Sequence, residues 1–225
     1  MDWKLALETY RESRAGAPLG DVAVMERAAQ RRPSPAINDQ LERVRAYAPE
    51  VSSDSLRSLP KGSLGGEYAH MLLLNKLEHL SISEPVLKRF ADNPYAIRYT
   101  VTHDLHHVLT GFDTGLAGEV GVVGFTVGQG TAPLSASGMQ LFRWLYVLMS
   151  PSQARATLHN YGLGVRMGER AKLVLAEPLE SWLEQPLALV RKRLSIREED
   201  IAEVYASGSS WLFRIYGATV APAAD

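Results

Sequence analysis

Apolar residues recur at helical spacing through most of this 225-residue chain, and this pattern limits the fold more than any other feature. No stretch combines sustained alternation of apolar and polar residues with many β-branched residues, which is the pattern expected of a half-buried strand. Hydrophobic residues make up 46% of the chain, enough for a substantial core. The sequence therefore predicts an all-α fold, most simply one compact multi-helix domain over residues 1–225.

Proline, glycine and their neighbours divide the chain into separate helical segments. Asn93 offers a helix cap with Pro94 in the first turn, and Pro151 follows Ser150 where one helix ends and the next begins. The expected helices cover residues 2–13, 21–31, 36–47, 65–79, 84–91, 94–110, 114–128, 137–148, 152–176 and 186–194.

The composition excludes several classes of function. The formal net charge is -1, from 24 basic and 25 acidic residues, so no overall field favours nucleic acid, and we expect no nucleic-acid partner. The absence of cysteine excludes disulfides, thiolate nucleophiles and cysteine-ligated zinc or iron–sulfur sites. Any metal ion must therefore be held by histidine, carboxylate or backbone groups.

Neither the N-terminus nor the most apolar segment indicates a membrane-spanning or secreted protein. The first residues mix acids and bases without an apolar core, unlike a secretory signal, and the acids also argue against a mitochondrial transit peptide. The segment Met139–Met149 contains Gln140 and Arg143 and is shorter than the roughly 20 residues needed to cross a bilayer. We expect a cytoplasmic protein, either free or peripheral on the inner face of a membrane.

His103 and His107 lie four residues apart, so on a helix both imidazoles project from one face and can reach one ion. Asp104 is either a third ligand or an acceptor that orients a histidine ring. Glu119 is an isolated charge among small and apolar residues, where a carboxylate needs a nearby cation. Because Gly111 and residues 113–115 can turn the chain, an antiparallel helix would bring Glu119 back to the histidines.

This set predicts a divalent-metal site between two adjacent helices. Mixed nitrogen and oxygen ligands suit zinc, iron, manganese or cobalt better than magnesium. The alternative is an ordinary pair of surface histidines, since such spacing also arises by chance. We expect His106 to be a packing or surface residue, and the lone histidines His70, His79 and His159 to be structural.

Glycines recur every three or four residues after the histidine pair, and glycine is costly inside a helix. Close packing against another helix is the favoured explanation, because a face without side chains lets a second backbone approach. The alternative is room for a slim apolar ligand. The glycines are Gly111, Gly115, Gly118, Gly121, Gly124 and Gly128.

The spacing His103-Asp104-x-x-His107 followed by Glu119, with Gly111, Thr114 and Gly118, resembles the signature of the coenzyme Q (ubiquinone) biosynthesis protein four family. Similarity extends from about residue 55 to 197 and leaves residues 1–50 unassigned. One departure follows Glu119, where residues 121–125 are glycine-rich and the pocket is expected to differ in width. Further matching positions are Leu59, Pro60, Gly62, Ser63, Leu64, Gly65, Tyr68, Arg98, Gly168, Glu169, Arg170, Ala171, Leu187, Arg191, Leu194 and Ile196.

The resemblance implies a metal-dependent protein of ubiquinone biosynthesis that binds a polyprenyl lipid or a prenylated benzoate. It implies oxidative decarboxylation at ring carbon C1 of a polyprenyl-hydroxybenzoate. His103, His107 and Glu119 would ligate the metal, and Asp104 would either ligate it too or orient a histidine. In this reading Asp104 and Arg98 are the candidate catalytic residues, and Arg98 helps to hold the substrate carboxylate. Other ubiquinone-biosynthesis proteins are expected partners, and a homodimer stays open.

Two other functions remain open from the sequence. In the first, the protein is a non-catalytic scaffold that binds prenyl lipid, and the segment Met139–Met149, with Trp144 and Tyr146, faces lipid or a partner protein. In the second, His103-Asp104 belongs to a His-Asp-type metal phosphohydrolase. That enzyme would need His70 or His79 and a distant aspartate such as Asp200 as further ligands.

Overall fold

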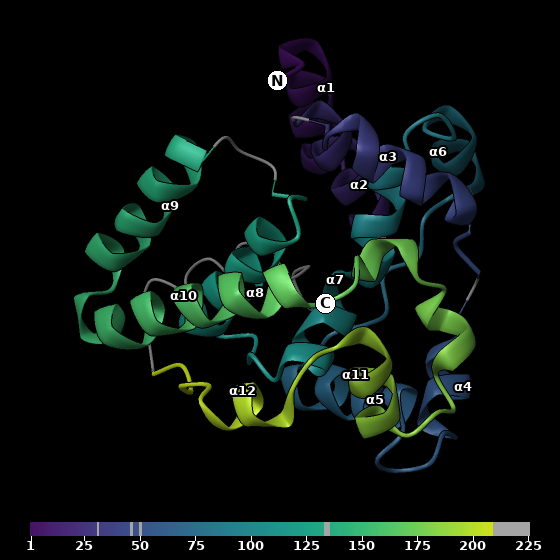
Figure 1. Ribbon diagram of the computed structural model, residues 1–225. Helices are drawn as coiled ribbons and strands as arrows, with labels where there is room; N and C mark the ends of the chain where they lie inside the picture. The colour runs from purple at the N-terminus through teal and green to yellow at the C-terminus, as the bar shows by residue number, and fades with distance from the viewer. Residues whose placement is uncertain (31, 46, 50, 133–135, 209–225) are drawn as a thin grey trace.

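The computed structural model describes residues 1–30, 32–45, 47–49, 51–132 and 136–208, and these residues form helices joined by short connections (Figure 1). No strand occurs among them, and the one isolated β-bridge joins Ser63 to Pro186. The predicted all-α fold is confirmed. Residues 209–225 lie outside the described part, so the single domain over residues 1–225 stays a prediction.

Helical elements make up most of the described chain. In chain order they are α1 (Trp3–Arg14), α2 (Leu19–Ala29), α3 (Pro35–Leu41), α4 (Ser53–Arg57), α5 (Leu64–Asn75), α6 (Glu84–Arg89), α7 (Pro94–Thr110), α8 (Leu116–Gly128), α9 (Ala136–Met149), α10 (Ala154–Arg170), α11 (Leu187–Leu194) and α12 (Glu198–Ala202), with short 3-10 helices at Glu42–Val44, Pro151–Gln153, Val174–Ala176 and Leu179–Trp182.

Local chemistry sets both ends of α7, as the sequence predicts. The Asn93 side chain accepts a hydrogen bond from the Ala96 amide at 3.3 Å, and Pro94 occupies the first turn. Gly111 ends the helix with φ +75°, a left-handed conformation that glycine adopts without strain. The predicted bounds of 94–110 are therefore confirmed.

Two predicted helices are too long. The prediction over 65–79 fails at Lys76, which adopts a left-handed conformation with φ 54° and ends α5. The prediction over 152–176 fails at Arg170, because the next residues bond elsewhere. The Lys172 amide donates to the Leu194 carbonyl, and the Gln129 side chain bonds both Lys172 and the Val174 amide.

Short elements are the other departure from the sequence prediction. The expected helix at 36–47 is an α-helix only to Leu41 and then a 3-10 helix. The helices at Ser53–Arg57 and Glu198–Ala202 were not predicted, since five residues show too little periodicity to stand out.

The glycines of α8 allow its close approach to α10, and the two helices lie side by side in Figure 1. A Cβ atom at Gly124 would lie 2.3 Å from the Tyr161 carbonyl oxygen, and one at Gly128 would lie 2.3 Å from that of Val165. From the other side, a Cβ atom at Gly164 would lie 2.2 Å from the Gly121 carbonyl oxygen. Helix packing, the favoured explanation of these glycines, is thus confirmed at the α8–α10 contact.

The main core lies beneath α5, α7, α8, α10 and α11, and buried apolar residues from Leu56 to Ile196 contribute to it. A smaller cluster packs Val24 of α2 against Ala96 and Ile97 of α7. Helix α7 therefore lies between the N-terminal helices and the main core.

No helix in the described part of the chain is both long and apolar enough to cross a membrane.

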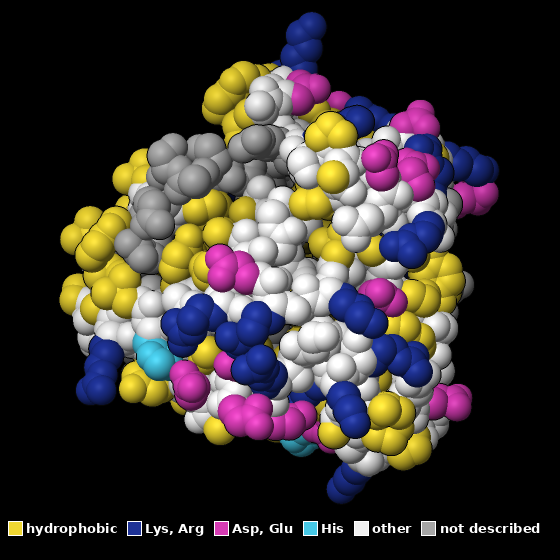
Figure 2. Space-filling view, viewed as in Figure 1, with side chains coloured by type: hydrophobic (Ala, Val, Ile, Leu, Met, Phe, Trp, Pro, Cys, Tyr) yellow, Lys and Arg dark blue, Asp and Glu magenta, His cyan; other side chains and the backbone are white. Residues whose placement is uncertain are grey.

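Helix α9 packs mainly against α10 and carries an exposed apolar face. In Figure 2, apolar side chains line its outer edge, at the left of the view. The exposed residues are Leu141, Trp144, Leu145, Leu148 and Met149.

Candidate metal centre

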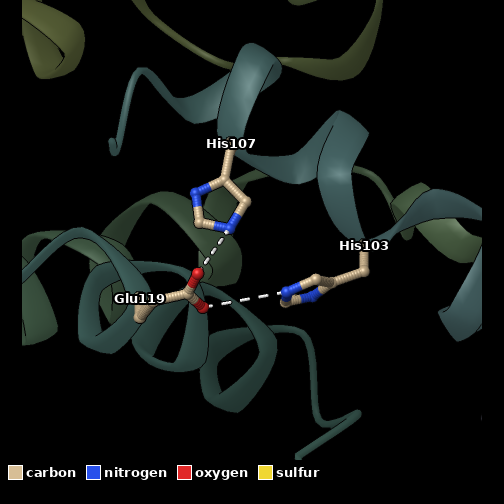
Figure 3. Close-up of side chains that lie close together, drawn as sticks. All are labelled: His103, His107 and Glu119. Atoms are coloured by element: carbon tan, nitrogen blue, oxygen red, sulfur yellow. Dashed lines mark ion pairs between the residues drawn. The ribbon is translucent and has the colours of Figure 1, made fainter. Parts of the chain in front are cut away.

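Two neighbouring helices bring three ligand side chains together. His103 and His107 project from the same face of α7, and Glu119 projects toward them from the first turn of α8 (Figure 3). A carboxylate is favoured in the first turn of a helix, where the free amides carry partial positive charge. The predicted site between two adjacent helices is present in the geometry.

A tight turn between α7 and α8 sets the position of Glu119. After Gly111, the Asp113 carboxylate accepts hydrogen bonds from the Gly115 amide at 2.9 Å and from the amide and hydroxyl of Ser207 at 2.6 Å each. Gly118 lies directly over the Asp113 carbonyl, where a Cβ atom would clash. The glycines of this turn therefore serve the return of the chain rather than a helix face.

The three side chains offer ligand atoms that all lie within 4.8 Å of one another. His107 Nε2 lies 3.4 Å from Glu119 Oε1, and His103 Nε2 lies 3.7 Å from Glu119 Oε2. The side chains of His103 and Glu119 are 29% and 30% exposed, whereas that of His107 is 2% exposed. The cluster thus has a buried side and a side that solvent or a substrate can reach.

Backbone carbonyls orient the His107 ring for metal binding. Its Nδ1 lies 3.1 Å from the carbonyl oxygens of both Phe112 and Asp113, so Nδ1 carries the proton and donates it. In the neutral ring, Nε2 is then a lone-pair acceptor that faces the Glu119 carboxylate, another acceptor. Such a pair requires a proton or a metal cation between the two atoms, and the arrangement is typical of a metal-bound histidine.

The charges of the cluster are strongly coupled. Burial acts to lower the pKa of His107, but the Glu119 carboxylate, with smaller contributions from Asp104 and the Phe112 carbonyl, outweighs burial and raises it to about 9. Burial acts to raise the pKa of Glu119, but the two histidines outweigh it and hold that pKa well below its usual range. Without a metal ion the His107 imidazolium is the cation of the site. In addition, His103 Nδ1 is buried without a hydrogen-bond partner among the described residues.

Asp104 lies outside the ligand cluster. Its Oδ2 accepts a hydrogen bond from the Tyr68 hydroxyl at 3.4 Å, and the same hydroxyl lies 2.9 Å from Nδ1 of His79. Of the two roles predicted for Asp104, this geometry favours a place beside the ligands over direct coordination. The partner is Tyr68 rather than a ligand histidine, and no sequence pattern indicated that contact.

Arg98 has protein partners for its guanidinium. It is 0% exposed, and it donates to Glu180 Oε1 at 2.7 Å and to the carbonyl oxygens of Tyr47, Leu175 and Glu177 at 2.8–3.2 Å. These contacts give Arg98 a structural role, in which it ties α7 to two connecting segments. The predicted contact with a substrate carboxylate has no support in this geometry.

The remaining histidines are separate from the cluster. His106 is buried, donates from Nδ1 to the Thr102 carbonyl at 2.7 Å and packs against Phe125, as expected of a packing residue. His159 stacks on Tyr205 with ring centroids 4.1 Å apart. Asp200 is paired with Arg170. The metal cluster of the described residues includes none of the additional ligands that a His-Asp phosphohydrolase would need.

Comparison with known proteins identifies the family. The family model of coenzyme Q (ubiquinone) biosynthesis protein Coq4 matches residues 39–200. The mitochondrial ubiquinone biosynthesis protein COQ4 homolog of Danio rerio is 32% identical over 167 residues, which cover 72% of this chain and 59% of that protein. The homolog of Bos taurus is 31% identical over 198 residues, covering 79% and 71% respectively.

A solved structure supports the fold. A Nostoc punctiforme protein provisionally assigned to ubiquinone biosynthesis superposes with a TM-score of 0.58 at 19% identity, covering 87% of this chain and 97% of that one. The match to the family model begins at residue 39, upstream of the region that the sequence motifs indicated. This chain belongs to the coenzyme Q (ubiquinone) biosynthesis protein Coq4 family.

Proposed function

We propose that this protein acts in ubiquinone biosynthesis as a metal-dependent enzyme that replaces the C1 carboxylate of a prenylated hydroxybenzoate with a hydroxyl group. The observation that supports this most is the cluster of His103, His107 and Glu119, with two ligands partly exposed. Three protein ligands leave coordination positions for substrate, and two histidines with one carboxylate are also the ligand set of non-haem iron oxygenases.

The residues present fit a divalent ion of the zinc, iron, manganese or cobalt class. The buried His107 ring is held by two carbonyls with Nε2 directed at Glu119, and these donors are nitrogen and carboxylate oxygen rather than an all-oxygen shell. When bound, such an ion supplies a Lewis acid that polarises a substrate oxygen. The protein supplies the orientation of the ligands and a buried wall behind them.

The proposed reaction breaks the bond between ring carbon C1 and its carboxyl carbon and forms a bond from C1 to oxygen. The carboxyl group leaves as carbon dioxide. One atom of dioxygen becomes the new hydroxyl, and the other leaves as water after accepting two electrons and two protons from a two-electron reductant. The substrate carboxylate and dioxygen must therefore both reach the open side of the cluster.

Purified protein loaded in turn with iron, cobalt, manganese or zinc would be incubated with carboxyl-labelled prenylated hydroxybenzoate, dioxygen and a reductant. We expect labelled carbon dioxide with at least one metal and its loss in Glu119→Ala. His159→Ala, which changes a histidine outside the cluster, should retain activity. If no metal supports release while prenyl lipid still binds tightly, the enzymatic proposal fails.

A specific observation favours a second function, a non-catalytic scaffold that binds prenyl lipid. The apolar face of α9 is exposed, with Leu141 72% and Leu148 74% exposed. An apolar patch of this kind is typical of lipid or protein contacts. In this function the metal fixes α7 against α8, and the protein lies peripherally on the inner face of a membrane beside other biosynthesis proteins.

The double variant Leu141→Glu with Leu148→Glu tests this second function. Both side chains face solvent, so folding should be preserved. Sedimentation with vesicles that contain polyprenyl lipid should be lost in the variant and retained in the parent protein. Equal sedimentation of both proteins would show that α9 does not contact the lipid.

A further inference from the structure

The N-terminal helix α2 places a guanidinium on a tyrosine ring that neighbours the candidate metal centre. The Cζ atom of Arg27 lies 3.7 Å from the centroid of the Tyr99 ring, a close cation–π contact. The Tyr99 ring in turn stacks on the ring of the ligand His103, with centroids 5.7 Å apart and planes at 19°. Arg27, Tyr99 and His103 therefore form one continuous stack that ends at the metal cluster.

Arg27 is held in place by the packing of its helix. Val24, one turn earlier on α2, is fully buried against Ala96 and Ile97 of α7. The Asp21 carboxylate accepts a hydrogen bond from the Ser83 amide at 2.7 Å, which ties the start of α2 to the segment before α6. The guanidinium is thus held on a fixed element rather than on a loop.

Arg27 is half-buried, and no carboxylate in the described part of the chain forms an ion pair with it. Its side-chain hydrogen bonds go to neutral partners, the Gln30 amide oxygen at 2.8 Å and the Tyr95 hydroxyl. A half-buried cation that lacks a counter-charge favours an anion as its partner. Arg98, by contrast, has its charge balanced by Glu180.

The net charge of the metal centre also favours a separate cation for the substrate anion. Glu119 in the cluster and Asp104 beside it supply two negative charges, which balance a divalent ion. An anionic substrate then gains little net attraction from the ion and its carboxylates together. Arg27 is a cation separated from the ligand His103 by the Tyr99 ring.

We propose that Arg27 binds the carboxylate of an aromatic acid substrate at the metal centre, with Tyr99 holding the guanidinium in place. This inference rests on the proposed function, because it names the residue that recognises the substrate anion of that reaction. It assigns a role to the N-terminal region, for which the sequence motifs gave none. A purely structural Arg27, which clamps α2 on α7 through Tyr99, is the alternative.

The test measures binding rather than turnover. It compares an acid with its uncharged analogue in order to isolate the effect of the carboxylate charge. The zinc-loaded full-length protein would be titrated with 3-farnesyl-4-hydroxybenzoate and with the corresponding methyl ester. Arg27→Gln should weaken binding of the acid by roughly tenfold to a hundredfold, the effect of losing a charge-assisted hydrogen bond, and leave the ester unchanged. Arg27→Lys should restore part of the affinity for the acid.

Arg155→Gln is the matched control, because this guanidinium also lies over a tyrosine ring, at 5.7 Å from the centroid of Tyr205, but away from the ligand histidines. It should leave both affinities unchanged. Equal weakening of acid and ester by Arg27→Gln, or a preference for the acid that survives in it, would overturn the inference. If Arg27→Gln does not fold, Arg27→Lys is used instead. A preference of Arg27→Lys for the acid over the ester of no more than about twofold would then overturn the inference. If the wild type binds neither compound, the proposed function itself fails and the inference fails with it.

Discussion

At the residue scale, the buried His107 ring predicts how metal binding depends on pH. The pKa of His107 is raised to about 9 by Glu119, so the metal-free ring is protonated at pH 7 and must lose that proton when it binds a metal ion. Affinity for zinc should therefore fall as the pH drops from 9 toward 6, by up to about tenfold per unit.

Calorimetric titration with zinc at pH 7 in two buffers of different ionisation enthalpy measures this proton directly. We expect release of about one proton per ion in the wild type and in His159→Ala. Zinc binding without proton release would show that His107 is neutral in the free protein or is not a ligand.

His106 gives a second prediction, for the stability of the metal-free protein. Burial lowers its pKa to about 3, from an ordinary value near 6.5. Above pH 6.5 the ring is neutral in both the folded and the unfolded chain and makes no pH-dependent contribution. As the pH falls below 6.5, only the unfolded chain gains the proton, so stability is lost until about pH 3.

Denaturant unfolding of wild type and His106→Asn between pH 7 and 4.5 tests this effect. Below pH 6, the free energy of unfolding of the wild type should fall more steeply than that of the variant, by about 1.4 kcal/mol per pH unit. The asparagine can keep a donor to the Thr102 carbonyl. Parallel pH dependences would show that His106 becomes protonated within the folded protein.

The residues that could be predicted from the sequence are those whose role depends on local spacing. His103 and His107 share a face because they are four residues apart on a helix, and Glu119 was indicated by its apolar neighbours and the short turn before it. Arg98 was assigned a substrate contact from the family resemblance, whereas its buried partner, Glu180, lies 82 residues further along the chain. Spacing alone carries no information on such a contact.

At the element scale, two glycines on α10 offer a matched pair of substitutions. In Gly164→Ala the new methyl group would meet the Gly121 carbonyl oxygen and the Phe125 amide of α8, which are backbone atoms that cannot move aside. We expect a loss of about 1–3 kcal/mol in the free energy of unfolding.

Gly162→Ala is the control, because its nearest neighbour would be the Arg166 guanidinium at 3.7 Å. It should be neutral or stabilise the protein by up to about 1 kcal/mol through helix propensity. Thermal or denaturant unfolding gives both values. Similar effects of the two substitutions would contradict the close α8–α10 contact.

The existence of most helices could be predicted from periodicity, whereas their ends could not. The start and end of α7 followed from Asn93, Pro94 and Gly111, which are local signals. The end of α10 at Arg170 depends on Gln129 and Leu194, which come from distant parts of the chain and capture the following backbone.

At the scale of the whole molecule, the cluster links α7 to α8, so metal binding should stabilise the fold. A ligand that binds only the folded state at about a thousand times its Kd contributes about 4 kcal/mol. A chelator should therefore lower the Tm of the wild type by several degrees and leave the Tm of Glu119→Ala unchanged. Equal shifts in both proteins would place the stabilising metal elsewhere.

Helix pairing is the part of the architecture that periodicity could not supply. Periodic apolar residues predicted helices within the first fifty residues without indicating their neighbours, yet α2 packs on the first turn of α7, at Ala96 and Ile97. The apolar segment of α9 was expected to face lipid or a partner only in the scaffold alternative, and its outer face is exposed.

The central claim is that His103, His107 and Glu119 bind one divalent ion. Elemental analysis of the protein purified from its own host, beside His107→Ala, Glu119→Ala and the control His159→Ala, tests it most directly. We predict about one equivalent of metal in the wild type and the control, and a loss of most of it in the other two, because each loses a ligand. Full metal occupancy in both His107→Ala and Glu119→Ala would contradict the assignment.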